Sequence, residues 1–173
     1  MKKIIIGLLS VFIIQNVAFS KEVIQFDFPN AGWHQVVSPD GNLNKKCFVP
    51  VNQTSDNYTE MLVFNKKILK NKGITPMVIL HKQLGKDRLN YKDIEPTYIK
   101  NDFDNAMVTW CSKSQNTCTV QRAFQGNEGI VIVTYKNRMP HYSQNMFGQW
   151  SNILSHVRLY NPITDTEKNK IEL

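Results

Sequence analysis

Three cysteines are the residues of this chain best suited to covalent chemistry. Cys111 and Cys118 flank a polar loop between two strand-like runs, and cysteines at opposed positions of a hairpin come within disulfide distance. We therefore predict a disulfide between Cys111 and Cys118 that leaves Cys47 out. The alternative pairings join Cys47 to one of the other two. A zinc site is disfavoured, because three cysteines without a C-x-x-C spacing make no recognisable set of ligands.

Cys47 is the best candidate for nucleophilic catalysis. Lys45 and Lys46 precede it, and neighbouring cations favour a thiolate. No histidine partner is identifiable, since the four histidines are scattered through the chain. The serine-hydrolase elbow, the zinc-protease motif and the glycine-rich nucleotide loops are all missing from the sequence. Asp102 and Asp104 lie in a turn, where backbone reasons explain both. We assign no catalytic residue and expect no metal or cofactor.

Lysines form the densest group of charged residues. Lys66, Lys67, Lys70 and Lys72 fall within seven positions, and Gly73 follows them. One interpretation is a solvated surface that keeps the protein dissolved. The sharper interpretation is a binding patch for an anionic lipid, a glycan or an acidic protein. Nucleic acid is disfavoured, because no motif that interleaves basic and aromatic residues is present.

Length and composition favour one exported globular domain. Of the 173 residues, 42% are hydrophobic and 20% are charged, which is typical of a folded protein and excludes a disordered tail or a disulfide-dense miniprotein. Lys2 and Lys3 precede an uncharged apolar run, Ile4–Ile14, and Ala18-Phe19-Ser20 supplies the small residues of a cleavage site. Residues 1–20 therefore read as a secretory signal peptide. The alternative, a membrane anchor, is disfavoured because this run is too short to span a bilayer core of about 30 Å.

The mature chain is then expected to begin near Lys21 and to lie in a periplasm or outside the cell. Its formal charge is +5, since the total of +7 includes the two lysines of the signal. We place a single domain at 21–161 and a polar C-terminal tail, predicted to fray, at 162–173.

Hydrophobic alternation predicts most of the elements. Strands are expected at Val23–Phe28, Trp33–Val37, Cys47–Val51, Pro96–Lys100, Ala106–Cys111, Cys118–Phe124, Gly129–Tyr135 and Arg158–Tyr160. Residues Tyr58–Leu69 read as a longer strand or as the start of a helix. Thr75 and Pro76 supply an N-cap and a first-turn proline for a helix in the run Met77–Leu89. Gly85 weakens the middle of this run, so the helix is expected to end before Leu89. Ser143 would cap a second helix, Gln144–Val157, whose apolar stripe is Phe147, Trp150, Leu154 and Val157. This order predicts an α+β fold around a mostly antiparallel sheet.

Two segments carry a resemblance to a known family. They are Phe26-Asp27-Phe28-Pro29-Asn30-Ala31-Gly32-Trp33 and, after the strand Gly129–Tyr135, Phe147-Gly148-Gln149-Trp150 leading to Val157-Arg158-Leu159. An early Gly-Trp after a strand and a final helix that packs on the sheet resemble the PsbP/Mog1-like family. That resemblance implies an α/β/α sandwich. It implies no functional residue, because members of the family bind very different partners.

The function expected from these patterns is that of an exported, non-enzymatic binding protein, such as a secreted, virulence-associated effector that recognises an anionic or protein partner. The alternatives are a secreted enzyme with an unrecognised site and a periplasmic accessory subunit of a membrane complex. A deep pocket lined by a histidine and a carboxylate would favour the enzyme, and a basic face would favour binding.

Overall fold

The structure is a computed structural model that describes residues 22–29, 32–68, 73–138, 144–163 and 169–173. The signal peptide predicted at 1–20 lies outside these ranges. The described part of the chain holds ten strands and two helices. The strands are β1 Val23–Gln25, β2 Trp33–Val36, β3 Lys45–Pro50, β4 Glu60–Ile68, β5 Thr97–Asp102, β6 Asn105–Ser112, β7 Thr117–Gln125, β8 Gly129–Asn137, β9 Arg158–Leu159 and β10 Lys170–Glu172; the helices are α1 Pro76–Asn90 and α2 Gln144–Ser155.

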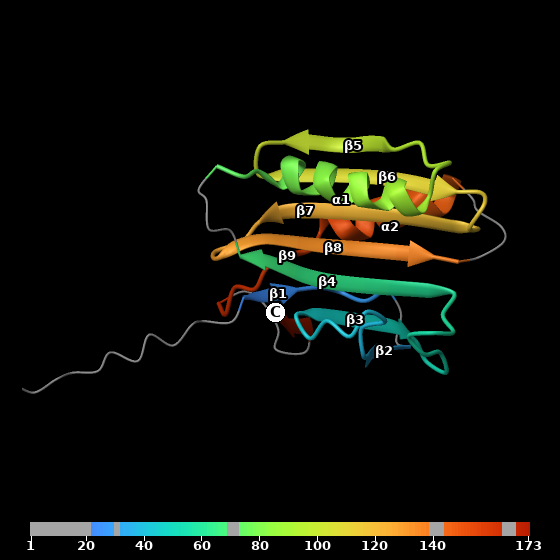
Figure 1. Ribbon diagram of the computed structural model, residues 1–173. Coiled ribbons are helices and arrows are strands. Elements are labelled where there is room, and N and C mark those ends of the chain that lie inside the picture. The colour runs from blue at the N-terminus through green and yellow to red at the C-terminus, as the bar shows by residue number, and fades with distance from the viewer. Residues whose placement is uncertain (1–21, 30–31, 69–72, 139–143, 164–168) are drawn as a thin grey trace, which may run out of the picture.

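Seven strands form one sheet in the order β2-β3-β4-β8-β7-β6-β5, and every neighbouring pair is antiparallel. Three short strands form a second sheet, β10-β1-β9. Figure 1 shows the large sheet edge to edge, with α1 over β6 and β7 and with β4, β3 and β2 outside the helix's cover.

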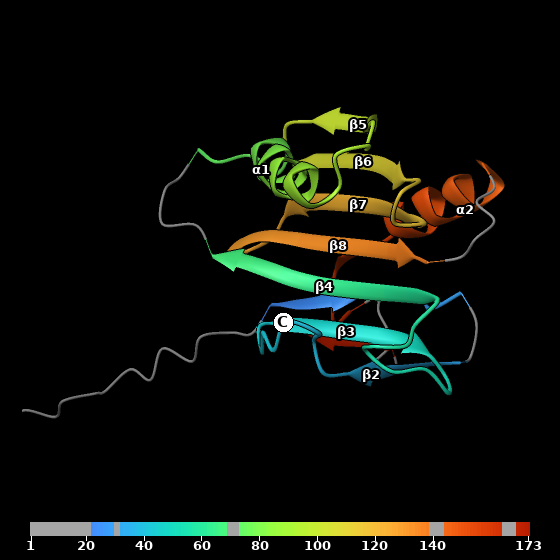
Figure 2. The ribbon, with the colours of Figure 1, turned by 45° about the vertical axis from the view of Figure 1, so that its right-hand side comes forward.

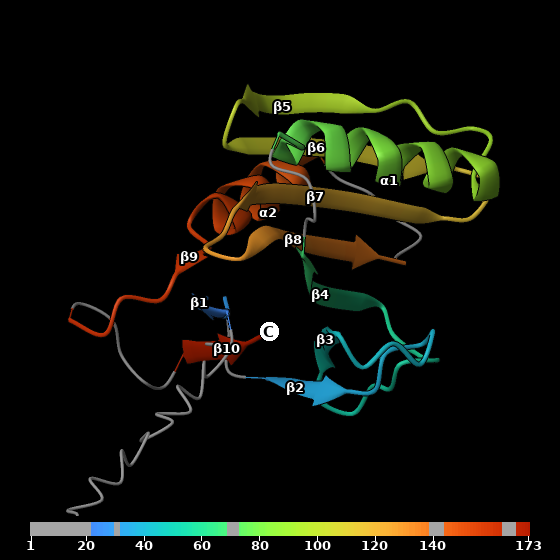
Figure 3. The same cartoon turned by 60° about the vertical axis from the view of Figure 1, so that its left-hand side comes forward.

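The two helices lie on opposite faces of the large sheet (Figures 2 and 3). Helix α1 packs on Ala106 and Val108 of β6, whereas Met107 between them faces the side of α2. This difference arises because successive side chains of a strand point to opposite faces of the sheet. The predicted α+β class is therefore confirmed, with a sandwich-like arrangement of a mostly antiparallel sheet between helices.

The larger core lies on the α2 face, between the large sheet and the small sheet. Fourteen buried residues form one cluster there, and they include Phe26, Phe64, Tyr135 and Trp150. Tyr135 stacks on Trp150 with ring centroids 3.8 Å apart, and Trp33 meets the edge of the same indole at 5.9 Å. Such aromatic contacts contribute beyond the area that they bury. This cluster fixes α2 on the sheet, and the apolar stripe predicted for that helix supplies Trp150 and Leu154.

Helix α1 begins as the sequence predicts. The Thr75 hydroxyl accepts a hydrogen bond from the Val78 amide at 3.4 Å, and Pro76 occupies the first turn. The early end predicted at Gly85 is wrong, because the helix runs on to Asn90. Leu84 is anchored in a cluster with Ile94 and Trp110, so tertiary packing outweighs the low helix propensity of glycine.

Residues Tyr58–Leu69, for which a strand and a helix were both considered, contain strand β4. The predicted fraying of the C-terminal tail is wrong for its last residues. Lys170–Glu172 form β10, which pairs with β1, and Ile171 is buried opposite Ile24. One buried apolar side chain and the ladder hydrogen bonds suffice to hold a short strand against its neighbour.

The predicted disulfide is present. Cys111 and Cys118 are directly opposed in the β6–β7 ladder, with their Cα atoms 4.1 Å apart, and Cys47 is free and buried. The opposite side of this hairpin tip contacts Asp93, whose carboxylate accepts hydrogen bonds from the Ser114 amide at 2.9 Å and from the Ser112 hydroxyl at 2.7 Å. These bonds lower the pKa of Asp93 to about 2.

Candidate binding site

A cleft of about 250 Å³ opens on the α1 face, between the helix and strands β3, β4 and β8. We call it the α1 cleft, and its central residues are Cys47, Asp87, Gln121, Thr134 and Lys136. It exists because α1 lies over β6 and β7 and does not extend over β4 and β3 (Figure 1).

Strand register brings the floor of the α1 cleft together. Gln121 of β7 pairs with Thr134 of β8, Thr134 pairs with Val63 of β4, and Val63 pairs with Cys47 of β3. Registered partners share a face of the sheet, so these residues form one row across four strands. Lys136 lies two residues beyond Thr134 and therefore on the same face.

Helix α1 contributes polar groups at helical spacing to the other wall. Gln83 and Asp87 are four positions apart, and the Gln83 side-chain amide donates to the Asp87 carboxylate at 3.2 Å. The Gln121 amide donates to the other Asp87 oxygen at 3.4 Å, which links the helix to the sheet across the cleft. Burial is the main reason why the pKa of Asp87 is raised.

Gln121 carries an unpartnered acceptor. Its side chain is 3% exposed, and its Oε1 atom is buried without a hydrogen-bond partner among the described residues. Because the Gln121 Nε2 atom donates to Asp87, the orientation of the amide is fixed and Oε1 remains available. Leaving a buried acceptor without a partner costs about 1–3 kcal/mol.

Lys136 places a cation beside these acceptors. Burial lowers the pKa of its ammonium group, and Asp87 opposes that shift. Asp40, Glu128 and Asp102 form ion pairs with Lys45, Lys66 and Lys100, and none of these pairs includes Lys136.

Cys47 faces the α1 cleft as a neutral thiol. It is fully buried, and desolvation is the largest reason why its pKa is raised, although Lys45 and Lys136 act in the opposite direction. The expectation that Lys45 and Lys46 favour a thiolate is therefore wrong: burial outweighs Lys45, and alternation along β3 directs Lys46 to the opposite face.

A group of lysines borders the cleft: Lys67 lies two residues beyond the lining residue Asn65 on the same face of β4, and Lys82 and Lys86 precede the lining residues Gln83 and Asp87 in α1. The pKa of Lys67 is lowered first by burial and then by the like charges of Lys86, Lys82 and Lys45. We call Lys45, Lys67, Lys82 and Lys86 the flanking lysines. Asp40 forms an ion pair with Lys45, and this contact lowers the pKa of Asp40 well below its usual range. The other three flanking lysines form no ion pair with a described carboxylate.

The four lysines predicted from the sequence to form one patch are only partly brought together. Lys66 and Lys67 are consecutive in β4 and so point to opposite faces of the sheet. Lys66 donates to Glu128 at 2.7 Å, and Lys67 belongs to the flanking lysines. Lys70 and Lys72 lie outside the described residues. The contact of this group with an anionic surface stays a prediction.

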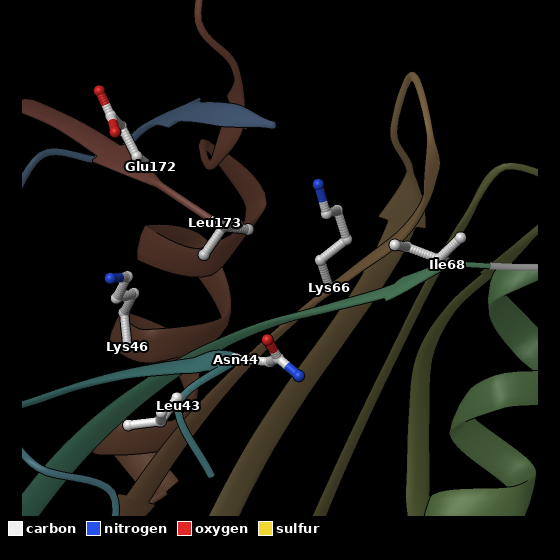
Figure 4. Close-up of a pocket in the computed structure, with 7 residues that line it drawn as sticks. All are labelled: Leu43, Asn44, Lys46, Lys66, Ile68, Glu172 and Leu173. Carbon is white, nitrogen blue, oxygen red and sulfur yellow. The ribbon is translucent and has the colours of Figure 1, made fainter. Parts of the chain in front are cut away.

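A second pocket, of about 480 Å³, opens on the opposite face (Figure 4). Lys46 and Lys66 stand on either side of Leu173 in this view, and Leu43 and Ile68 add apolar surface. This pocket has a larger volume than the α1 cleft. Among the described residues, however, none that lines it carries a buried polar atom without a hydrogen-bond partner. The ion pair with Glu128 also compensates the charge of Lys66.

The described residues place neither a histidine nor a metal-binding cluster at the α1 cleft. None of the three described histidines, His34, His81 and His156, lines the α1 cleft. His81 instead contacts the Tyr98 hydroxyl at 3.1 Å. Within the described ranges, no group of three or more His, Cys, Asp or Glu residues could hold a metal ion. No helix of the described residues has the length and hydropathy needed to cross a membrane.

Comparisons with known proteins give no family: no protein-family model and no curated protein matches this chain.

Sequence reasoning missed Asp87, Gln121 and Lys136. Their positions in the chain are far apart, and only the strand register and the path of α1 bring them together. One local signal was present. Thr119 and Gln121 are polar, yet they occupy alternate positions of a strand, Thr117–Gln125, that is buried along both faces. Polar residues at core positions of a strand indicate a site where a sheet face is not closed by packing.

Proposed function

We propose that this chain is an exported, non-enzymatic protein that binds an anionic partner in the α1 cleft. The observation that carries this proposal is the set of lysines without carboxylate partners, Lys67, Lys82 and Lys86, beside a cleft that contains Lys136. The cleft lining contains three cations, Lys45, Lys136 and Arg138, and two carboxylates, Asp40 and Asp87, so together with the three unpaired lysines the local charge is positive and attracts anions.

The chemistry of the cleft favours binding over catalysis. A carboxylate, Asp87, is present, but no described histidine lies beside it to move a proton. The Cys47 thiol is kept neutral by burial, and a neutral thiol is a poor nucleophile. The alternative of a secreted enzyme with an unrecognised site therefore has less support than a binding protein.

Export rests on the signal read from residues 1–20 and is supported by the Cys111–Cys118 disulfide, since disulfides persist in oxidising compartments. Intact-mass measurement of protein purified from its native host tests it. A mature chain that begins within two residues of Lys21 is expected, and retention of residues 1–20 would refute export by this signal. Recovery from the culture medium would favour a secreted effector, and recovery from the periplasm would favour an accessory subunit of a membrane complex.

The resemblance to the PsbP/Mog1-like family is part of this proposal. The two segments that carry it meet on the α2 face, where Trp33 contacts Trp150. This contact supports the resemblance as a statement about fold, and the functional argument does not depend on it.

Calorimetric titration with inorganic phosphate, over a series of salt concentrations, tests anion binding. The variant K67Q/K82Q/K86Q removes the uncompensated charges, and the control K92Q/K113Q removes two exposed lysines elsewhere that also form no ion pair with a described carboxylate. We expect the first variant to weaken binding about tenfold or more, and the control to change it about twofold or less, because distant exposed charges are screened. Equal losses in the two variants would contradict a specific role for the cleft.

A titration of Lys66→Gln in the same series compares the two pockets. Because Lys66 is already paired with Glu128 and points away from the α1 cleft, we expect little change in phosphate affinity. Co-sedimentation with neutral and anionic vesicles tests separately whether Lys66, Lys67, Lys70 and Lys72 contact an anionic surface. Binding that requires anionic lipid and weakens with salt is expected.

A further inference from the structure

The deep part of the α1 cleft offers acceptors that need hydrogen-bond donors from a ligand. Gln121 Oε1 is buried and without a partner among the described residues. The Asp87 carboxylate accepts only long bonds, at 3.2 and 3.4 Å, from Gln83 and Gln121. A carboxylate has about four acceptor positions, so Asp87 can receive further donors. An anion without donors, such as a simple inorganic ion, would leave Gln121 unsatisfied and would be repelled by Asp87.

The neighbouring cations restrict what kind of donor can satisfy these acceptors. Lys136 lies in the same cleft, and the flanking lysines lie beside it. A ligand ammonium group would gain from Asp87 but would be repelled by these cations. Neutral donors, above all hydroxyl groups, avoid this repulsion and can also accept hydrogen bonds from Lys136.

The aromatic rings of the cleft argue against a ligand that binds by stacking a base. Arg138 covers the ring of Tyr58, with its guanidinium carbon 4.0 Å from the ring centroid. Tyr91 contacts Trp110, with ring centroids 5.3 Å apart. Because both tyrosines already have ring partners, neither offers an unoccupied platform of the kind that nucleotide bases use.

The size of the cleft restricts the ligand further. Its volume of about 250 Å³ lies just below the range typical of sites for drug-sized ligands, about 300–1,000 Å³. A compact ligand with several hydroxyl groups fits this volume better than a peptide or a dinucleotide. Its negative group would remain near the flanking lysines, where the uncompensated positive charge lies.

We infer that the ligand of the α1 cleft is a monosaccharide that carries one acidic group, with its hydroxyl groups on Gln121 and Asp87 and its anion toward the flanking lysines. The inference rests on the proposed function, since it presupposes that anions bind in this cleft. A sugar carboxylate and a sugar phosphate share this chemistry, and the titration separates them.

Calorimetry with four probes tests the inference: glucuronate, glucose 6-phosphate, glucose and inorganic phosphate. We expect at least one of the two sugar anions to bind about tenfold or more tightly than either glucose or inorganic phosphate, because glucose lacks the anionic group and inorganic phosphate lacks the sugar hydroxyl groups. Equal affinities for inorganic phosphate and both sugar anions would overturn the inference while leaving anion binding in place. No binding of any anion would overturn the proposed function itself.

The variant Gln121→Met locates the hydroxyl contacts, because it keeps the side-chain volume and removes the acceptor. It should lower affinity for the preferred sugar anion about tenfold and leave the affinity for inorganic phosphate unchanged. K67Q/K82Q/K86Q should weaken both. Asp87→Asn, at the other proposed acceptor, provides a second variant should Gln121→Met fold poorly. Unchanged sugar affinity in a folded Gln121→Met or Asp87→Asn protein would contradict this placement of the hydroxyl groups.

Discussion

The two faces of the large sheet are built from the same strands but differ in how continuously they are packed. On the α2 face, one continuous cluster of fourteen buried residues joins the sheet, α2 and the small sheet. On the α1 face, the buried residues separate into three smaller clusters. Gln121, Thr134 and Lys136 lie between those clusters and form the floor of the cleft. Continuous packing on one face supplies the stability that allows the other face to hold polar groups that pack poorly.

Two buried polar side chains, Arg122 on the α2 face and Gln121 on the α1 face, differ in whether their polar atoms have partners. On the α2 face, the Arg122 guanidinium donates to the carbonyls of Leu154 and Val157, each at 2.6 Å, and so satisfies the end of α2. Burial lowers the pKa of Arg122 to about 10, which leaves it charged at neutral pH. On the α1 face, Gln121 Oε1 has no partner among the described residues. Ser151 Oγ of α2 and Gln25 Oε1 of β1 are also buried without a partner among the described residues, so it is the position in the α1 cleft that distinguishes Gln121 Oε1.

The largest effect is expected from truncating the centre of the α2 face. Trp150 is 6% exposed and contacts both Tyr135 and Trp33. Trp150→Ala should lower the free energy of unfolding by about 3–5 kcal/mol, as large aromatic truncations do in packed cores. Urea denaturation followed by circular dichroism measures this loss. A loss smaller than that of Leu84→Ala, in a small cluster of the α1 face, would contradict the assignment of the main core to the α2 face.

A smaller loss is expected at the tip of the β6–β7 hairpin, which is held on both sides. The double variant C111S/C118S removes the disulfide and should lower the free energy of unfolding by about 2–3 kcal/mol. The loss is modest because the disulfide closes only a short loop and so restricts the unfolded chain less than a longer loop would. Denaturation under non-reducing conditions measures the effect. Peptide mapping without reduction provides the control, and a bridged peptide containing Cys47 as the main species would show that the pairing is wrong.

On the other side of the same tip, Asp93 should make the stability of the protein depend on pH. The pKa of Asp93 is about 2 in the folded protein, below its ordinary value of 3.8. The ionised carboxylate therefore stabilises the fold above pH 3.8, and this contribution is lost as pH falls through about 2. Asp93→Asn should be less stable than the wild type at pH 7, with a difference that shrinks toward pH 2. A difference that stays constant with pH would show that the charge of Asp93 is not involved.

The smallest effect on stability is expected in the α1 cleft. Gln121→Met removes one long hydrogen bond to Asp87 and also removes a buried acceptor that has no described partner. These changes oppose each other, so the free energy of unfolding should change by about 1 kcal/mol or less. The same urea series used for Trp150→Ala measures this change. A loss as large as that of Trp150→Ala would show that Gln121 supports the fold and not a ligand.

The sequence predicted much of the fold for identifiable reasons. The strands emerged because their alternation is strong, α1 because Thr75 and Pro76 mark its start, and the disulfide because Cys111 and Cys118 flank one turn. Strand β10 was missed because Ile171 alone carries its hydrophobic signal. The prediction of one patch around Lys66 and Lys67 did not take into account that consecutive side chains of a strand point to opposite faces of the sheet.

The site was not predictable to the same extent. Cys47 was singled out for its lysine neighbours, but its environment depends on burial between β3 and the residues across the sheet. Asp87, Gln121 and Lys136 carry no motif and meet only through strand register and helix packing. Local patterns encode elements, whereas a cleft between elements depends on long-range geometry.

Amide chemical-shift mapping by NMR, during titration with glucuronate and with inorganic phosphate, tests whether anions bind in the α1 cleft. We expect shifts confined to this cleft and its borders, at Lys67, at residues 82–87 of α1 and around Gln121 and Lys136. The second pocket, around Lys46 and Lys66, should remain unchanged. Shifts centred on Lys46 and Lys66, or no saturable shifts with either anion, would contradict the assignment of the binding site to the α1 face.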